Sequence, residues 1–524
     1  MENNHLNQQQ SVNASAAPQY APQMQPPRRR PMEKFPITKG DFRMALAAIL
    51  WTYVAFLLTL GNGMALGFML TYLSGFILFT VYFYQKGKTV LKPFETICGA
   101  LAVCTAPMVV LTGNGTKVLL TFLSFACCII WFASLCGKQE RATDAGLIPH
   151  VVTMFFGNAF GALGRSMGSL FSSGGEKHRH AWLWKAMIGL AVSLPITGIL
   201  LLLLTSADQA FSDLVQRIVE NIGEQILRIF LALLFSPFVF AFALGLKKKA
   251  PPAPKQEKNG GIEFPYVTAF LGLVSAVYLL YLFSQFAYFF NGFAGILPKG
   301  VLPADYARKG FFELCTIAAI NFVMLFLVLL FTMKKETRLP APVKWESAFI
   351  CLFTLVLIAT VFSKMILYIK LFGLTQLRVY TMVFMAFMAV LFIALLVRLF
   401  VRKVRVLRIG LVTAMCLLLA LSLCRIDYQV SRYNVWAYET GRLSEIDLYS
   451  ISENGDAGVA VLYEIYNNDG LPKYQYRAKM LLRTKARTRF YVEDGQIKPY
   501  RNEKWTEWIY EESKADQILR NFVK

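Results

Sequence analysis

Long, uninterrupted apolar runs constrain this chain more than any other feature of its sequence. Each run approaches the roughly 20 residues that a helix needs to cross the hydrocarbon core of a bilayer. The runs are rich in Leu, Phe, Ala and Met and do not alternate with polar residues, which favours helices over strands. They cover residues 44–60, 64–84, 95–113, 118–137, 182–205, 227–246, 266–290, 311–333, 346–369, 379–397 and 407–424. We therefore expect an all-α polytopic membrane protein with about eleven transmembrane helices and a small, mainly helical C-terminal extracytoplasmic domain.

The composition excludes two other classes of protein. Of the 524 residues, 56% are hydrophobic and 16% are charged, whereas soluble domains average about 45–50% and about 25%. This much apolar sequence excludes disorder over most of the length. The nine cysteines all lie in apolar stretches, so a disulfide scaffold is excluded as well.

The net charge of +22 predicts how the helices are oriented. If residues 1–43 are cytoplasmic, 29 of the 54 Lys and Arg residues fall on the cytoplasmic side, 9 in the opposite loops and 16 in the tail after residue 424. Basic residues gather on the cytoplasmic side of membrane proteins. We therefore expect a plasma-membrane protein with a cytoplasmic N-terminus and an extracytoplasmic C-terminus. Because topology accounts for the charge, nucleic acid is not an expected partner.

Polar segments divide the chain into five expected parts. Residues 1–43 are rich in Gln, Asn and Pro and are expected to form a disordered, basic, cytoplasmic arm. Residues 44–246 and 266–424 are expected to form two transmembrane bundles, of six and five helices. A cytoplasmic linker rich in Pro, Gly and Lys joins them at 247–265. Residues 425–524 form the helical, extracytoplasmic tail.

One cytoplasmic stretch, residues 138–181, is neither polar like a loop nor apolar enough over its length to span the bilayer. Gly157, Gly161, Gly164 and Gly168 recur in it at helical spacing and offer a smooth face for close helix contact. Two interpretations stay open, a re-entrant or interface-lying segment and a glycine-rich linker that rests on the membrane.

Three polar stretches on the expected outer face carry candidate functional residues. The first, residues 205–213, places Asp208 near the positive end of a helix, because Ser206 and Gln209 have the spacing of a capping box. The second, residues 304–313, runs directly into a span, and the third extends from 364 to 378. A weaker, fourth group follows the last span and consists of Arg425, Asp427, Arg432 and Asn434.

Ionisable groups at the edge of the apolar zone are costly unless they are paired. Asp208 and Glu313 could therefore meet Arg308, Lys364 or Arg378 across neighbouring helices. One interpretation is a pocket or ion path, open to the outside, in which a carboxylate binds and releases a proton or a cation. The other is a set of ion pairs that lock helix ends together, with lysines that snorkel to the surface. The residues favour the second interpretation, because no acid lies at mid-depth of a span.

Common enzyme motifs are missing from the sequence. There is no Gly-x-x-x-x-Gly-Lys-Ser/Thr stretch and no His-Glu-x-x-His. Four histidines in all, two of them flanking an arginine in a basic loop, leave no His-based acid–base pair or metal-ligand set. We expect no metal and no cofactor, and whether the protein is an enzyme stays open, with a non-enzyme favoured.

The stretch Tyr306-Ala307-Arg308-Lys309-Gly310-Phe311-Phe312-Glu313-Leu314 resembles the hallmark of a family of uncharacterised bacterial multi-pass membrane proteins. That family is known as a domain of unknown function and is common in Firmicutes. The stretches 206–211 and 368–378 are similar to its pattern, and the resemblance covers about residues 45–470. It implies which residues matter rather than an activity. With Lys364 added from its position at a span edge, the candidate set is Asp208, Phe211, Tyr306, Arg308, Gly310, Glu313, Lys364, Tyr368, Thr375 and Arg378.

Three functions compete on this evidence, all of them in a lipid bilayer. The first is a transporter or channel-like protein for a small solute or ion, with the outer polar cluster as its mouth. The second is a non-transporting envelope or sensory scaffold whose tail binds a protein partner. A membrane enzyme acting on a lipid-linked substrate is least favoured. Transport predicts polar groups at mid-depth on facing helices, or a helix broken near the midplane, for which Pro195 and Pro237 are the candidates.

Overall fold

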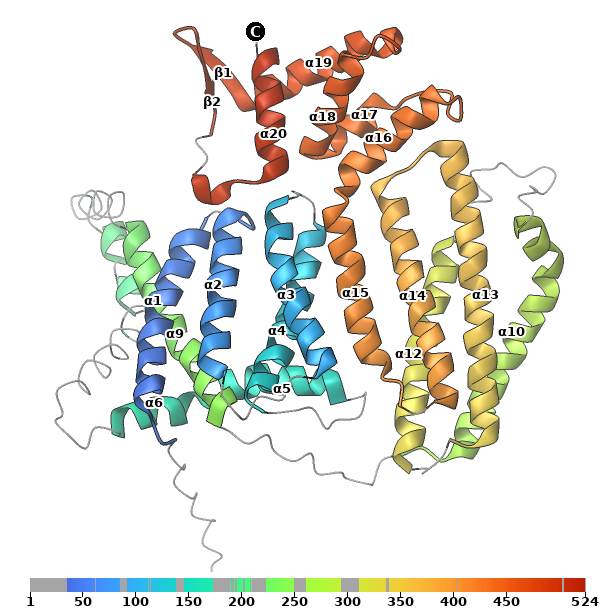
Figure 1. Cartoon of the computed structure of the whole chain (residues 1–524), viewed down its shortest axis with the longest axis horizontal. Helices are drawn as coiled ribbons and strands as arrows, with labels where there is room; N and C mark the ends of the chain where they lie inside the picture. Colours follow the sequence, from blue (N-terminus) through green and yellow to red (C-terminus); the bar gives the residue numbers. More distant parts are fainter. Residues whose placement is uncertain are drawn as a thin grey trace, which may run out of the picture.

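A computed structural model describes most of the chain. It covers residues 35–61, 63–84, 92–111, 113, 115–137, 146–172, parts of 189–209, 223–248, 261–293, 311–335, 339–401, 403–501 and 504–523. Upright helices form a broad layer, and the C-terminal tail lies on one face of it (Figure 1). We call this the tail face. The N-terminal end of the first helix lies at the opposite face (Figure 1).

The upright helices follow the predicted apolar runs. They are α1 (Lys39–Thr59), α2 (Leu66–Phe83), α3 (Pro93–Leu111), α4 (Thr116–Leu135), α9 (Glu224–Lys248), α10 (Phe264–Phe293), α12 (Phe311–Lys335), α13 (Ala341–Phe372), α14 (Gln376–Phe400) and α15 (Val406–Leu423). Each contains a stretch long and apolar enough to cross a bilayer. The prediction of an all-α polytopic membrane protein is thus confirmed, and its environment is a lipid bilayer.

One further segment passes the same test of length and composition but does not stand upright. Residues Leu147–Ser169 are apolar enough to span, yet a break at residues 160–162 divides them into α5 (Leu147–Ala159) and α6 (Leu163–Ser172). Both helices lie across the ends of the upright helices, at the face opposite the tail (Figure 1). With 13 residues, α5 is about 20 Å long, less than the roughly 30 Å of a hydrocarbon core. This arrangement agrees with the interface-lying interpretation of residues 138–181.

The expected span at 182–205 lies mostly outside the described residues. The described part belongs to a shorter apolar helix, Ile196–Ala207. Its neighbours in the chain lie at opposite faces. Ala162, just before α6, is close to Gly245 near the end of α9, whereas Glu224 at the start of α9 lies 3.9 Å from Lys504 of the tail. The crossing that the sequence predicts at 182–205 stays a prediction.

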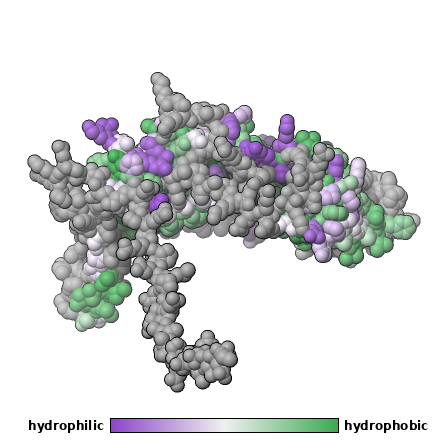
Figure 2. Space-filling view, turned by 90° about the horizontal axis from the view of Figure 1, so that it is seen from below, coloured by the Kyte–Doolittle hydropathy of each residue, from purple (hydrophilic) through white to green (hydrophobic). Residues whose placement is uncertain are grey.

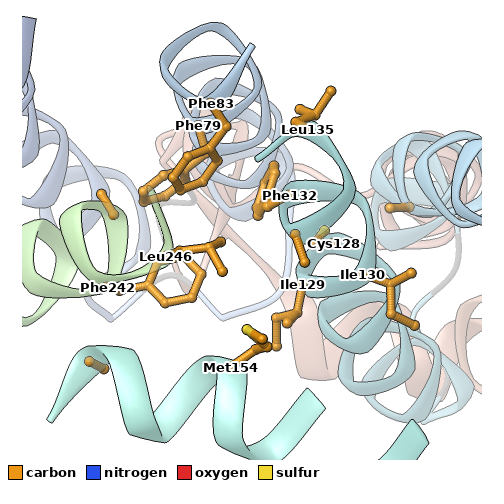
Figure 3. Close-up of a cluster of buried hydrophobic side chains, with 14 of the residues drawn as sticks. Phe79, Phe83, Cys128, Ile129, Ile130, Phe132, Leu135, Met154, Phe242 and Leu246 are labelled. Atoms are coloured by element: carbon orange, nitrogen blue, oxygen red, sulfur yellow. The ribbon is translucent and has the colours of Figure 1, made fainter. Parts of the chain in front are cut away.

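Helices α1, α2, α3, α4 and α9, with α5 beneath them, share one apolar core. Figure 3 shows Phe79 and Phe83 of α2 facing Phe132 of α4 and Phe242 of α9. The ring of Phe132 lies 5.5 Å from those of Phe79 and Phe83, and Phe242 lies 5.8 Å from Phe79. Aromatic rings at such distances favour edge and offset contacts. We call these five helices the first helix group.

Helices α10, α12, α13 and α14 form a second helix group with its own apolar core. Polar side chains meet near the middle of three of its helices. The hydroxyl of Tyr278 lies 2.5 Å from Oδ1 of Asn321, and Nδ2 of Asn321 donates to the hydroxyl of Thr354 at 2.9 Å. Hydrogen bonds of this kind hold membrane helices together. Helix α15 contacts α14 of this group as well as α3 and α4 of the first, so it joins the two groups.

The tail folds around a separate apolar core. Its elements are α16 (Ile426–Glu439), α17 (Leu448–Glu453), α18 (Gly455–Tyr466), α19 (Pro472–Arg489), β1 (Phe490–Glu493), β2 (Gln496–Pro499), η3 (Trp505–Glu507), α20 (Tyr510–Leu519) and η4 (Arg520–Phe522). Strands β1 and β2 pair antiparallel, with Phe490 opposite Pro499. Viewed from the face opposite the tail, hydrophilic residues gather in patches and hydrophobic residues show at both ends of the molecule (Figure 2).

The tail binds both helix groups. On the first group, the backbone N–H of Leu66 donates to the carbonyl of Trp508 at 3.3 Å, and the N–H of Gly113 donates to the carboxylate of Glu511 at 3.4 Å. On the second group, Nε2 of Gln376 donates to Oδ1 of Asn454 at 3.1 Å. The tail therefore bridges the ends of the two groups.

Candidate functional site

A cavity of about 1530 Å³ lies between helices α4 and α5 on one side and α14 and α15 on the other. Small-molecule sites are typically about 300–1,000 Å³, so this cavity is large. Its side walls are apolar along the membrane helices, and α5 contributes Val152 and Phe155. Residues of the tail line its other end, where the walls carry carboxylates.

Several aromatic side chains of the cavity wall are largely uncovered by the rest of the protein. Phe122 is 72% exposed, Phe125 50% and Phe384 42%, although all three belong to membrane helices. Apolar side chains are equally exposed elsewhere on the membrane helices, as at Val81 (72%) and Phe283 (88%). In a bilayer the natural contacts of these rings are hydrocarbon chains.

At the tail end, two of the four wall carboxylates are held by arginines. The wall there includes Asp427, Glu453, Asn454, Asp456 and Glu511. Glu511 is only 4% exposed, and Nε of Arg425 donates to it at 2.8 Å. Asp456 pairs with Arg489. Such charge-assisted bonds fix the position of α20 and α18 over the cavity.

Asp427 lies in the first turn of α16, directly after the last membrane helix. Arg425 precedes it in the left-handed backbone conformation, with φ of 49°, which turns the chain sharply from α15 into α16. Asp427 is 9% exposed, and its Oδ1 atom has no hydrogen-bond partner among the described residues. Burial, together with the negative charge of Glu511, raises the pKa of Asp427 to about 6. This carboxyl can therefore take up or release a proton near neutral pH, or bind a cation.

The third predicted polar stretch forms the turn between α13 and α14. The hydroxyl of Thr375 accepts the N–H of Arg378 at 3.4 Å and caps α14. The guanidinium of Arg378 lies 4.2 Å from the ring centroid of Tyr368 and donates to the carbonyls of Phe372, at 3.1 Å, and Gly373. These three predicted residues are thus brought together, and their contacts with one another secure a helix end.

Asn434 of the tail holds this same turn. Its Oδ1 accepts the N–H of Leu374 at 2.7 Å, and its Nδ2 donates to the carbonyl of Leu374 at 2.8 Å. Gly373 adopts φ of 76°, and a Cβ at this position would lie 2.7 Å from Oδ1 of Asn434. Only glycine fits this position without strain or displacement of the amide.

The other predicted residues are not brought into this cluster by any described contact. Glu313 is exposed in the first turn of α12, and Lys364 is half-buried within α13. Asp208, Phe211, Tyr306, Arg308 and Gly310 lie outside the described residues. The meeting of Asp208 and Glu313 with the basic residues therefore stays a prediction.

Two structural expectations of a transport path can be compared with the described helices. Polar groups do meet at mid-depth, in the Tyr278–Asn321–Thr354 contact, although the cavity walls do not include them. Pro237 lies inside an unbroken α9, while Pro195 lies outside the described residues.

Within the described part of the chain, no group of three or more His, Cys, Asp or Glu side chains is placed to hold a metal ion.

Sequence reasoning missed the cavity itself and the role of Glu511. The weak fourth group was the available signal, since Asp427 lines the cavity, Arg425 donates to Glu511 of its wall and Asn434 clamps the neighbouring turn. Arg432 lies 3.4 Å from Glu464 within the tail. Glu511 is 84 residues beyond Asp427 in a separate helix, so no local pattern connects the two.

The chain belongs to the family described as Domain of unknown function (DUF4153), which matches residues 96–465. This span runs from α3 to α18 and includes every wall of the cavity except Glu511. The predicted family, a domain of unknown function, is confirmed at this level. No curated protein and no solved structure matches the chain.

Proposed function

We propose that this integral membrane protein is transporter-like and that its substrate is an amphiphile of the membrane, taken up in the cavity between the two helix groups. The observation that supports this most is the cavity's composition: apolar walls along the membrane helices and carboxylates at the tail end. A hydrocarbon chain would lie against Phe122, Phe125 and Phe384, and a polar head would reach the carboxylates.

The same walls argue against a hydrophilic solute or a bare ion as the substrate. Moving a polar group along an apolar wall without hydrogen-bond partners costs several kcal/mol. The mid-depth polar groups of the second helix group already bond to one another, since Asn321 contacts both Tyr278 and Thr354. An amphiphile avoids this cost because only its head needs polar contacts.

We further propose that the protein lies in the plasma membrane of a bacterial cell, with residues 1–43 cytoplasmic and the tail face extracytoplasmic. The distribution of Lys and Arg supports this orientation. In this proposal 44–246 and 266–424 are the two membrane bundles, 247–265 is the cytoplasmic linker and 425–524 is the tail. The outer polar cluster predicted around Asp208, Arg308 and Glu313 would then lie on the same side as the carboxylate end of the cavity.

Reconstitution into liposomes tests the proposal. Fluorescently labelled phospholipids and alkyl amphiphiles would be followed as they cross the bilayer, alongside proton, alkali-cation and amino-acid flux. The variants Ala126→Trp and Ala414→Trp place a bulky ring in the cavity from opposite walls, and we expect them to slow amphiphile movement about tenfold or more. Val81→Trp is the matched control, because Val81 is 72% exposed on α2 and does not line the cavity.

The result that overturns the proposal is amphiphile movement no faster than in empty vesicles. Flux of ions or amino acids without amphiphile movement would instead support a hydrophilic solute or ion as the substrate. Absence of every flux would favour the second candidate, a non-transporting scaffold whose tail binds a protein partner. The specific observation behind that candidate is that the tail has its own core and bridges both helix groups.

A further inference from the structure

We infer that the amphiphile taken up in the cavity carries a primary ammonium head group and that Asp427 binds it. This inference rests on the proposed function, because it assigns the head group of the same substrate. It gives the substrate a chemical class, a long-chain amine or an amine-bearing lipid.

The position of Asp427 carries the inference. It sits where the apolar walls end, just past Leu418 and Leu421 of α15, which also line the cavity. The side chain is buried, with 9% exposure, and Oδ1 makes no hydrogen bond with any described residue. A buried carboxylate oxygen without a partner is costly, and a donor on a bound ligand would remove that cost.

The surrounding charges favour a cation. Among the described residues, the ion pairs at this end of the cavity involve Asp456 with Arg489 and Glu511 with Arg425. Glu453 and Asp456 lie near Lys485, and Lys117 of α4, which donates to the carbonyl of Met64 at 2.9 Å, lies near Glu511 and Glu512. Asp427 differs from these carboxylates, because its charged neighbour is the negative Glu511. At Asp427 an anionic head group would therefore meet repulsion, whereas a cationic head group would be attracted.

The chemistry of the wall selects among cations. A divalent metal needs several oxygen or nitrogen ligands in fixed geometry, and no described cluster of acidic, Cys or His side chains provides them. A quaternary ammonium has no N–H to donate and is usually bound by aromatic faces. A primary ammonium has three donors, which suits the carboxylate of Asp427 at the end of the apolar walls.

Photoactivatable probes of identical chain and different head test the inference. Hexadecylamine, hexadecanol and hexadecyltrimethylammonium, each with a diazirine in the chain, would be added to the full-length protein in nanodiscs, and labelled peptides would be mapped by mass spectrometry. We expect the amine to label peptides of α14 and α15 about tenfold more efficiently than the alcohol or the quaternary probe. Asp427→Asn should remove this preference. Glu445→Gln, the same change at an exposed position of the tail, should keep it.

The outcomes separate the two proposals. If no probe labels the cavity walls, the cavity does not bind amphiphiles and the proposed function fails. If all three probes label the walls equally, or if Asp427→Asn keeps the preference for the amine, the cavity binds amphiphiles but the head-group assignment is overturned. If the amine and the quaternary probe label the walls equally, and both more than the alcohol, the cavity recognises only the positive charge of the head. The assignment of a primary ammonium is then overturned.

Discussion

Asn434 offers a sharp test of how the tail is attached to the membrane helices. Substituting Asn434→Ala removes both hydrogen bonds to Leu374, at 2.7 and 2.8 Å. Each bond contributes about 1 kcal/mol net, and leaving the half-buried N–H and carbonyl of Leu374 without partners adds a further penalty of about 1 kcal/mol or more. We therefore expect the local opening free energy at this turn to fall by about 2–4 kcal/mol.

Hydrogen–deuterium exchange measures this opening free energy in peptides that contain the Leu374 amide. A loss of about 2–4 kcal/mol predicts that the amide of Leu374 exchanges roughly 30 to 700 times faster in Asn434→Ala than in wild type. The measurement would follow peptides spanning residues 370–378 from protein in nanodiscs. Thr375→Ala is the control, since it removes the cap of α14, costs about 1 kcal/mol and leaves the Leu374 bonds in place.

Unchanged exchange of the Leu374 amide in Asn434→Ala would refute the reasoning, because the clamp would then contribute nothing. So would a change no larger than that caused by Thr375→Ala. A thiol-reactive dye provides an independent check of the membrane helices, since Cys98, Cys127, Cys128 and Cys351 are buried and react only when those helices open. We expect the dye to react with these cysteines at the same rate in Asn434→Ala and in wild type, because the contacts between Asn434 and Leu374 lie outside the apolar cores.

Two further predictions concern stability. Asp427→Asn should stabilise the protein at pH 7.5 by at most about 3 kcal/mol, less where water screens the charge, and by only about a third of that gain at pH 4.5. The reason is that the folded-state pKa of Asp427, about 6, exceeds its ordinary value of 3.8. Wild-type stability therefore falls as the pH rises through this range. Equal gains at both pH values in thermal melts would contradict the prediction. Gly99→Ala should destabilise by about 1–3 kcal/mol, because a Cβ there would lie 2.8 Å from the ring of Trp131, whereas Gly164→Ala, with no atom within 4 Å, should be neutral in the same melts.

The membrane helices could be predicted because the length of an apolar run is a local property of the sequence. The third run, interrupted by Gly99 and Pro107, still forms an unbroken α3 from Pro93 to Leu111, since a membrane helix tolerates proline where neighbours satisfy the backbone. Residues 147–169 could not be assigned from composition alone, because two short apolar helices and one long one have the same hydropathy. The break at residues 160–162 decides between them.

The candidate site was predictable only in part, for a different reason. The turn around Gly373 and Thr375 has a local signature, a glycine at a helix end followed by a capping hydroxyl, and its residues do meet. The cavity depends on α4 packing near α15, almost 300 residues later in the chain. Nothing in either segment specifies that contact, and the same holds for Asp427 and Glu511.

The attachment of the tail to both helix groups determines how the cavity can widen. The tail is bonded to Gly113 of the first group and to Leu374 and Gln376 of the second, so the two groups are pinned together at one end. Any rotation of one group against the other must then pivot about these hydrogen bonds. Over the roughly 30 Å of a bilayer core, a rotation of about 5° separates the far ends by roughly 3 Å while the pinned ends hardly move. A rotation of this kind would open the cavity at the face where α5 lies, with the tail at its pivot.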